Sequence, residues 1–231
     1  MALGFFIVNF APSKPNYFVM KCTLCEGEDL ITFKGIDGVA FYRCNHCFLI
    51  FKSPDVWLRP EDEKERYQQH NNSEDCPGYV EFLNQALEPT LPFMEEDMEG
   101  MDFGCGPNPV LARMVEKTGC QCSFYDPHFF PELPDERQDF IFATECFEHF
   151  FNPHQELKLL TALLRPSGTL TIMTNLWNED DPVENWWYTK DPTHVTFFHS
   201  KTIDYICSRY GYDIEYSDDR KVIVLRKRVV R

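Results

Sequence analysis

Basic side chains are scarce in this sequence of 231 residues, where 22 lysines and arginines stand against 37 aspartates and glutamates. The formal net charge is −15. A surface this negative repels phosphate backbones, so the composition disfavours nucleic acid as a partner. The dense basic run Arg226–Arg228, with Arg231, lies at the C-terminal end, where a solubilising tail is the simplest interpretation.

Long hydrophobic runs are also lacking. The apolar stretch Leu3–Phe10 has no basic flank of the kind that precedes a signal peptide, and it is far shorter than the ~20 residues needed to cross a bilayer. We therefore expect no membrane association and a cytoplasmic protein whose cysteines stay reduced. Residues 1–19 have little polar patterning, and Met20 would make a natural start, so we interpret them as an extension or a loosely attached arm.

Four of the ten cysteines form the strongest local pattern of the chain. Cys22 and Cys25 make one Cys-x-x-Cys knuckle, and Cys44 and Cys47 make a second. This spacing is typical of a tetrahedral zinc site with four thiolate ligands, which leaves no open position and is therefore structural. A pair of disulfides or unrelated cysteines is the alternative. We predict a small zinc-ribbon-like module over residues 20–55, with a hairpin between the knuckles.

Residues 56–96 are predicted to form a linker and covering helices. A polar run from Glu61 to Arg66 is typical of a linker or a solvated helix. From Tyr79 onward, apolar side chains recur at helical spacing. Tyr79, or Tyr67 with His70, can then cover a ligand bound to the following domain, although a packing helix with incidental tyrosines fits equally well.

The stretch from Met101 to Pro109 has the pattern of a buried strand, a glycine turn and the start of a helix. Gly104 and Gly106 allow positive φ and a close approach of a ligand to the backbone. We expect Asn108 to cap the helix, with Pro109 at its first position. An ordinary tight turn between strand and helix gives the same pattern, so the surrounding residues decide its meaning.

Asp126 closes a second apolar strand about 20 residues after the glycines, where a nucleotide-binding fold places a carboxylate for ribose hydroxyls. With this strand, the run Asp102–Asn108 resembles the Asp-x-Gly-x-Gly-x-Gly motif of class I S-adenosylmethionine (SAM)-dependent methyltransferases, with Asn108 in place of the third glycine. The resemblance implies a Rossmann-like α/β sheet over residues 97–231 and SAM as cofactor. The residues then expected around SAM are Asp102, Gly104, Cys105, Gly106, Asp126, Pro127, Glu145 and Tyr79.

The segment that follows Asp126 is too short for the complete fold of that family. Only residues 127–138 precede the next strand, whereas a helix and a third strand need a crossover of a dozen or more residues besides the strand itself. Three prolines within the segment oppose both elements. We therefore predict that strand 3 and helix B are missing and that the strand ending at Asp126 forms an edge of the sheet. The aromatic run His128–Phe130 is then available to stack on the cofactor.

Glu145 and the pair Glu148–His149 follow the next strand at its carboxyl end, where an open α/β sheet binds ligands. The Glu-His pair followed by Asn152-Pro153 resembles the fourth motif of many small-molecule methyltransferases. His149 and His194 are the candidate general bases, because an unperturbed imidazole titrates near ~6.5. A base is needed only if the acceptor must lose a proton, and the Glu-His pair can instead serve only to cap or pack.

Residues 178–199 form a polar and aromatic insertion after the last predicted parallel strand. Long ordered loops at this edge tend to be lids or binding loops. We expect this insertion to bind the substrate, and a satellite core beneath a loop is the alternative. The predicted substrate residues are Glu148, Trp186, Trp187, Tyr188 and Asp191.

Together with the resemblance, these patterns predict a SAM-dependent methyltransferase with a small-molecule acceptor. Zinc modules precede some ribosomal-RNA and some sugar methyltransferases, so the cysteines alone do not select the acceptor. An RNA methyltransferase that docks through its zinc module is one alternative. A non-catalytic, zinc-stabilised interaction protein that has lost the cofactor is the other.

Overall fold

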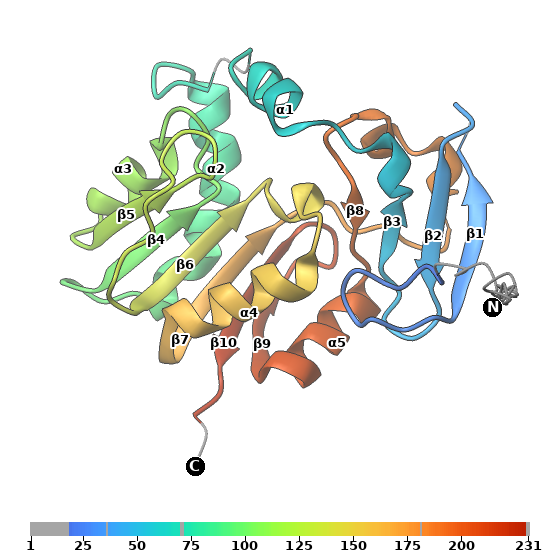
Figure 1. The fold of residues 1–231 in the computed structure, drawn as a ribbon. Helices are drawn as coiled ribbons and strands as arrows, with labels where there is room; N and C mark the ends of the chain where they lie inside the picture. Colours follow the sequence, from blue (N-terminus) through green and yellow to red (C-terminus); the bar gives the residue numbers. More distant parts are fainter. Residues whose placement is uncertain (1–18, 36, 70–71, 181, 230–231) are drawn as a thin grey trace, which may run out of the picture.

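The computed structural model describes residues 19–35, 37–69, 72–180 and 182–229. Of the predicted N-terminal extension only Val19 is included, and His70 also lies outside the described residues. A large sheet with helices on both faces lies beside a smaller sheet built mainly from the N-terminal part of the chain (Figure 1). Within the described ranges, no helix is long and apolar enough to span a membrane.

The large sheet has six strands in the order β5-β4-β6-β7-β10-β9. β4 pairs in parallel with β5 and β6, and β6 pairs in parallel with β7. β10 is antiparallel to both of its neighbours. The strands are β4 (Glu99–Phe103), β5 (Gln121–Tyr125), β6 (Gln138–Thr144), β7 (Leu164–Met173), β9 (Tyr212–Ser217) and β10 (Val222–Lys227).

The predicted absence of strand 3 and helix B is confirmed. β5 is an edge strand, and the fully described segment 126–137 holds an isolated bridge between Asp126 and Phe130 but neither a helix nor a further strand of the sheet. β7 starts at Leu164, directly after the preceding helix ends at Leu163.

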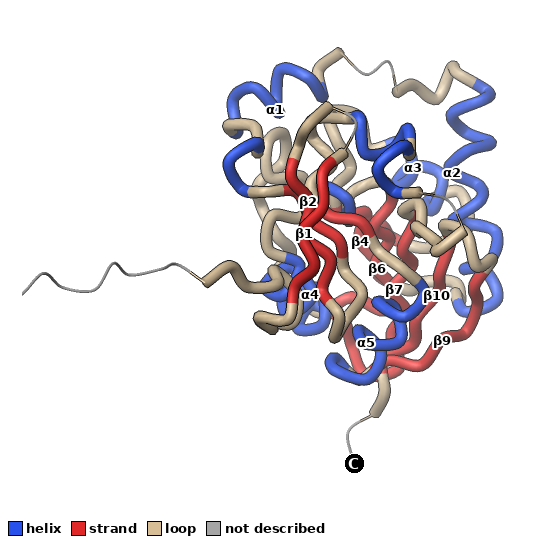
Figure 2. Tube along the Cα trace, turned by 90° about the vertical axis from the view of Figure 1, so that its right-hand side faces the viewer, coloured by secondary structure: helices blue, strands red, loops and turns tan. Residues whose placement is uncertain are grey.

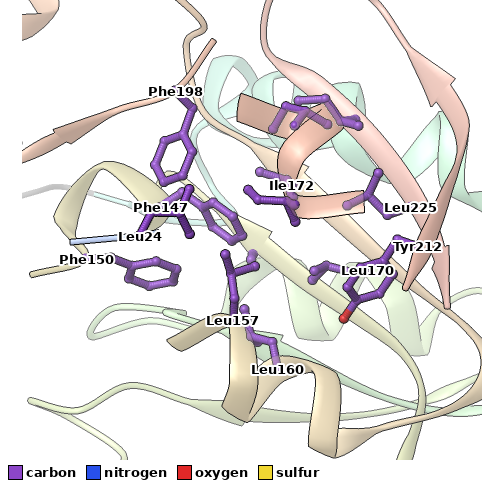
Figure 3. Packing of buried hydrophobic residues seen from close by; sticks show 14 of the residues in the cluster. Leu24, Phe147, Phe150, Leu157, Leu160, Leu170, Ile172, Phe198, Tyr212 and Leu225 are labelled. Atoms are coloured by element: carbon purple, nitrogen blue, oxygen red, sulfur yellow. The ribbon is translucent and has the colours of Figure 1, made fainter. Parts of the chain in front are cut away.

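Helices cover the large sheet on both faces. Leu157 of α4 and Ile206 of α5 belong to one apolar cluster, in which they pack with β7 and β10 (Figure 3). Leu83 of α2 and Leu111 of α3 belong to a second cluster on the opposite face. Each fully buried side chain of this size stabilises the fold by about 1.5–3 kcal/mol. The helices are α1 (Pro60–Tyr67), α2 (Pro77–Thr90), α3 (Val110–Glu116), α4 (Pro153–Leu163) and α5 (Ser200–Tyr210), with short 3-10 turns η1 (Pro54–Val56), η2 (Leu91–Phe93), η3 (Phe147–His149), η4 (Val183–Asn185) and η5 (Trp187–Lys190).

The start of α3 differs from the prediction. Pro109 is the residue before the first helical position, and no side chain caps the helix. Asn108 instead donates from Nδ2 to the carbonyl oxygen of Asn72 at 2.7 Å and accepts a hydrogen bond from Arg113. The side chain expected to cap the helix therefore ties the glycine turn to the segment before α2.

The smaller sheet has the order β1-β2-β3-β8, and all its pairs are antiparallel. Its first two strands form the hairpin predicted between the cysteine knuckles. Its fourth strand comes from the predicted insertion, far along the chain, and Figure 2 shows this sheet in front of the large one. The division into modules at residues 55 and 96 stays a prediction. The strands are β1 (Leu30–Lys34), β2 (Ala40–Cys44), β3 (Ile50–Lys52) and β8 (Thr196–Phe197).

Candidate functional site

A cavity of about 670 Å³ opens at the carboxyl ends of β4, β5 and β6 and is closed on one side by α1. This is the end of an open α/β sheet at which ligands bind. The residues predicted from the sequence that line it are Tyr79, Asp102, Gly104, Cys105, Gly106, Asp126, Pro127, Glu145, Glu148, His149, Asp191 and His194.

The glycine turn and Asp126 form one unit. Gly104 and Gly106 have φ values of 81° and 65°, in the left-handed region that favours glycine. Gly106 N donates to Asp126 Oδ2 at 2.9 Å, and His128 N donates to Asp126 Oδ1 at 2.8 Å. A Cβ on Gly104 would lie 2.7 Å from that of Cys146, so the turn also packs tightly against the end of β6. The carboxylate is therefore fixed beside the turn, and its predicted contact with a ribose stays a prediction.

Asp102 lies beneath this turn and is 2 % exposed. Its Oδ1 has no hydrogen-bond partner among the described residues, although the backbone of Ala112 donates to the carboxylate. Burial raises the pKa of Asp102 to about 7, and the charge of Asp126 adds to the effect. A buried carboxylate with a free oxygen is suited to a cationic or hydrogen-bond-donating ligand.

Glu145 follows β6 in a strained backbone conformation with a φ of 49°. Such a conformation costs about 1–3 kcal/mol for a residue other than glycine. Its N–H donates to the carbonyl oxygen of Met173 at 2.7 Å, which holds the turn in place. Burial and the charge of Glu148 raise the pKa of Glu145 to about 8, against the lowering effect of Lys221. This gives the cavity a second acidic group whose Oε1 is unpartnered within the described part of the chain.

Glu148, His149 and His194 converge on one wall of the cavity. One potential ligand atom from each lies within 4.8 Å of those of the other two. The rings of His149 and His194 are 4.9 Å apart, and Thr174 donates to Glu148 Oε2 at 2.8 Å. Burial lowers the pKa of His194, although the charge of Glu148 opposes this shift. The two histidines predicted to act as bases are thus neighbours, although 44 residues separate them in the chain.

Backbone pairing of the small sheet brings these distant segments together. Val195 N donates to the carbonyl oxygen of Glu148 at 2.8 Å. Lys52 N of β3 donates to the carbonyl oxygen of Val195, also at 2.8 Å. The position of His194 therefore depends on β3 of the N-terminal sheet.

Asp191 lines the cavity, but its oxygens are used within the protein. Its carboxylate accepts from Arg66 at 2.7 Å and from the N–H and Oγ1 of Thr193. Burial alone would raise the pKa of Asp191, yet these partners hold it below its usual range. These contacts attach α1 to the wall of the cavity, and the role of Asp191 in binding a substrate stays a prediction.

The three aromatic residues predicted to wall the pocket are not among the residues that line it. Trp187 is 65 % exposed. Trp186 and Tyr188 pack with Phe197 in a small separate core, where the rings of the first two are 4.9 Å apart. The prediction for Trp186, Trp187 and Tyr188 is corrected accordingly, and the alternative of a satellite core describes their environment. The physical reason is that β8 draws this stretch toward the small sheet.

Glu63 of α1 lines the cavity and was not predicted. It is 4 % exposed, accepts a hydrogen bond from Tyr67 Oη at 3.2 Å and lies 3.7 Å from His128 Nε2. Burial raises the pKa of Glu63 to about 7, against the lowering effect of Tyr67. The charged run around Glu63 is typical of a solvated helix, so the sequence gives no local signal that this carboxylate is buried.

The four cysteines of the two knuckles meet beside the small sheet. Cys22 Sγ lies 3.5 Å from Cys47 Sγ, and Cys25 Sγ lies 3.4 Å from Cys44 Sγ. These distances exclude disulfides, whose sulfurs are about 2.05 Å apart. They are close to the ~3.8 Å that separates ligand sulfurs when Zn–S bonds of about 2.3 Å are arranged as a tetrahedron. The donor set therefore fits zinc.

No curated protein matches the sequence with significant similarity. Among solved structures, the Burkholderia thailandensis 1,6-didemethyltoxoflavin-N1-methyltransferase, with 1,6-didemethyltoxoflavin and S-adenosylhomocysteine bound, is similar with a TM-score of 0.55 and 13% identity. The match covers 86% of this chain and 99% of that chain. The Haemonchus contortus phosphoethanolamine N-methyltransferase 2, in complex with SAM, has a TM-score of 0.53 and 14% identity over 78% of this chain and 62% of that one.

At these identities the structural neighbours establish the fold, which is that of the sheet described above. A family model described as a methyltransferase domain matches residues 69–217, well over half of the chain. This range includes the glycine turn, Asp126, and the cluster of Glu148, His149 and His194. The chain therefore belongs to the methyltransferase-domain family.

Proposed function

We propose that this protein transfers a methyl group from SAM to a small-molecule acceptor. The observation that carries the proposal is the glycine turn at the carboxyl end of β4, with the carboxylates of Asp102, Asp126 and Glu145 beside it in one cavity. SAM supplies an electrophilic methyl group on a positively charged sulfonium. In their ionised forms, the buried acids Asp102 and Glu145 stabilise such a cation through their unpartnered oxygens, and a bound cation in turn lowers their raised pKa values.

The residues of the turn suit different parts of the cofactor. Gly104, Cys105 and Gly106 present the backbone where the methionine moiety would lie. Asp126 is held beside them in the place of a ribose-binding carboxylate. Glu145, and Tyr79 from α2, line the same cavity and would lie along the cofactor.

The acceptor would lie toward Glu148, His149 and His194. Methyl transfer needs the nucleophilic atom in line with the C–S bond at contact distance, so positioning and exclusion of water supply much of the acceleration. If the acceptor must lose a proton, a neutral imidazole of His149 or His194 can take it. The high negative charge of the chain favours a small molecule over a nucleic acid. The small-molecule methyltransferases among the structural neighbours support the same class.

We also propose that Cys22, Cys25, Cys44 and Cys47 hold a structural zinc ion. Four thiolates would complete its coordination and leave no position for a substrate. The reducing cytoplasm predicted from the sequence is a compartment in which these thiols stay available.

Calorimetric titration with S-adenosylhomocysteine tests the cofactor assignment without knowledge of the acceptor. We expect micromolar binding by the zinc-loaded protein and at least tenfold weaker binding by Asp126→Ala. Asp135→Ala is the matched control, because Asp135 is exposed in the same loop. Absence of binding by the unmodified protein would refute SAM use and favour a non-catalytic role. Equal affinity of Asp126→Ala would refute the role of Asp126.

A further inference from the structure

Glu148, His149 and His194 have the composition of a metal site. Glu148 and His149 belong to η3, and His194 precedes β8. One nitrogen or oxygen atom from each lies within 4.8 Å of the others, and all three side chains line the cavity. Two imidazoles and a carboxylate are ligands that borderline divalent metals accept.

The two oxygens of the Glu148 carboxylate differ in their hydrogen bonding. Glu148 is 0 % exposed, and Thr174 Oγ1 donates to its Oε2 at 2.8 Å. Its Oε1 is fully buried and has no partner in hydrogen-bond geometry in the described ranges, although the hydroxyl of Tyr188 also interacts with this carboxylate. A buried acceptor without a partner costs about 1–3 kcal/mol, and more when charged. A cation at the cluster would satisfy this oxygen.

Hydrogen bonds to backbone carbonyls favour the tautomer of both histidines that ligates metals. His149 Nδ1 lies 3.0 Å from the carbonyl oxygen of Thr193, and His194 Nδ1 lies 2.9 Å from that of Tyr188. A carbonyl oxygen only accepts, so each neutral ring carries its proton on Nδ1 and keeps the lone pair on Nε2. Metal-ligating histidines are fixed in the same way, with the second ring nitrogen donating to a carbonyl or carboxylate.

We propose that Glu148, His149 and His194 bind one divalent transition-metal ion, such as Zn²⁺, Co²⁺ or Mn²⁺, in the wall of the cavity. Bonds of about 2.0–2.2 Å would require ligand atoms roughly 3–3.5 Å apart. The candidate ligand atoms lie within 4.8 Å of one another, so the three side chains would draw closer together around the ion. Mg²⁺ and Ca²⁺ are disfavoured because they prefer oxygen ligands. This site is distinct from that of the four cysteines, which lies beside the small sheet and has no open position.

Three protein ligands leave at least one coordination position for a molecule in the cavity. On the proposed methyltransferase function, on which this step rests, that molecule is an acceptor with a hydroxyl group. The metal would bind the hydroxyl oxygen and favour loss of its proton to water. The oxygen would then form the bond to the methyl carbon as the C–S bond breaks, which leaves a neutral thioether. His149 and His194 act in this scheme as ligands rather than bases.

The test is a Co²⁺ titration, followed by visible absorption, of protein that holds one zinc ion per chain, so that the four cysteines are occupied and the three-ligand site is left open. Cobalt bound to nitrogen and oxygen shows d–d bands, whereas cobalt at the cysteines adds thiolate charge-transfer bands. We expect one cobalt ion per chain without thiolate bands, and at least tenfold weaker binding by Glu148→Gln, His149→Gln and His194→Gln. His154→Gln, which alters a half-buried histidine of α4 outside the lining of the cavity, is expected to bind cobalt normally.

Absence of such bands in the unmodified protein would overturn the proposal, as would bands that persist in Glu148→Gln and His194→Gln. Thermal unfolding of each variant separates loss of the site from loss of the fold. S-adenosylhomocysteine titration of the same samples separates the two proposals. Cobalt binding without cofactor binding would refute methyl transfer and leave the metal site, whereas the reverse result would remove only the metal site.

Discussion

The two ends of the cavity are built in different ways. The cofactor end is local: the glycine turn follows β4, and Asp126 follows the adjacent parallel strand β5. The opposite end, around Glu148 and His194, joins segments far apart in sequence through the small antiparallel sheet. The residues of the first end are positioned by consecutive strands of the α/β sheet, whereas those of the second end are positioned by strand pairing between distant parts of the chain.

This difference predicts that the second end of the cavity loses its structure first when the small N-terminal sheet is destabilised. Cys44 and Phe51 belong to the same continuous apolar cluster as Phe147 and Phe198, which flank the second end. Figure 3 shows Phe147 and Phe198 near Leu24, which lies between Cys22 and Cys25 in the sequence. The proposed zinc ion would therefore stabilise the wall of a cavity that it does not touch.

The largest effect is expected from loss of the proposed zinc. Cys44 is fully buried, so Cys44→Ser should release zinc and destabilise the fold by several kcal/mol. For comparison, structural zinc contributes about 10–16 kcal/mol in small zinc fingers. The end of the cavity around His194 should be perturbed most. Metal analysis and thermal unfolding measure both changes. Cys76→Ser makes the same chemical change at an exposed site and should alter neither. An unchanged zinc content in Cys44→Ser would contradict the assignment.

Gly100→Ala tests the sheet beneath the cofactor end. A Cβ at Gly100 would lie 1.9 Å from the buried ring of Phe140, so the strands must separate or the ring must move. Overpacking of this kind costs about 1–3 kcal/mol, and we expect the upper part of that range. Denaturant unfolding gives the change. Gly78→Ala is the control, because nothing lies within 4 Å of its added Cβ. Equal stability of the two variants would show that Gly100 and Phe140 do not pack closely.

The pKa of Asp102 predicts how stability depends on pH. Its folded-state pKa of about 7 exceeds the ordinary value of 3.8, so the folded state holds a proton that the unfolded state has released. The free energy of unfolding should therefore decrease as the pH rises from about 4 to 7 and stay constant above 7. The contribution of Asp102 to this decrease is at most about 4 kcal/mol. Asp102→Asn should flatten that part of the profile measured by thermal unfolding. Asp135→Asn, at an exposed site, should leave it unchanged. A profile of Asp102→Asn that matches that of the unmodified protein would show that Asp102 is not protonated near neutral pH.

The sequence predicted the local parts of this molecule better than the distant ones. The glycine turn, the edge strand before Asp126 and the cysteine pairs each depend on neighbours within a short stretch. Glu63 was missed because the polarity of α1 gives no sign that one of its carboxylates is buried. The course of residues 186–188 was missed because β8 pairs with β3, and no local pattern encodes a pairing across more than a hundred residues.

Trp187→Ala is expected to have the smallest effect and tests the corrected position of the aromatic stretch. With 65 % of its surface exposed and no part in the cavity wall, Trp187 should contribute within about 0.5 kcal/mol to stability and nothing to cofactor or cobalt binding. Tyr188→Ala, in the same stretch but 1 % exposed, should cost about 3–5 kcal/mol, as removal of a buried aromatic ring does. Unfolding and binding titrations of this pair separate packing from ligand contact. If Trp187→Ala weakened cofactor or cobalt binding without a change in stability, Trp187 would be part of the binding site. The second end of the cavity would then extend to this residue.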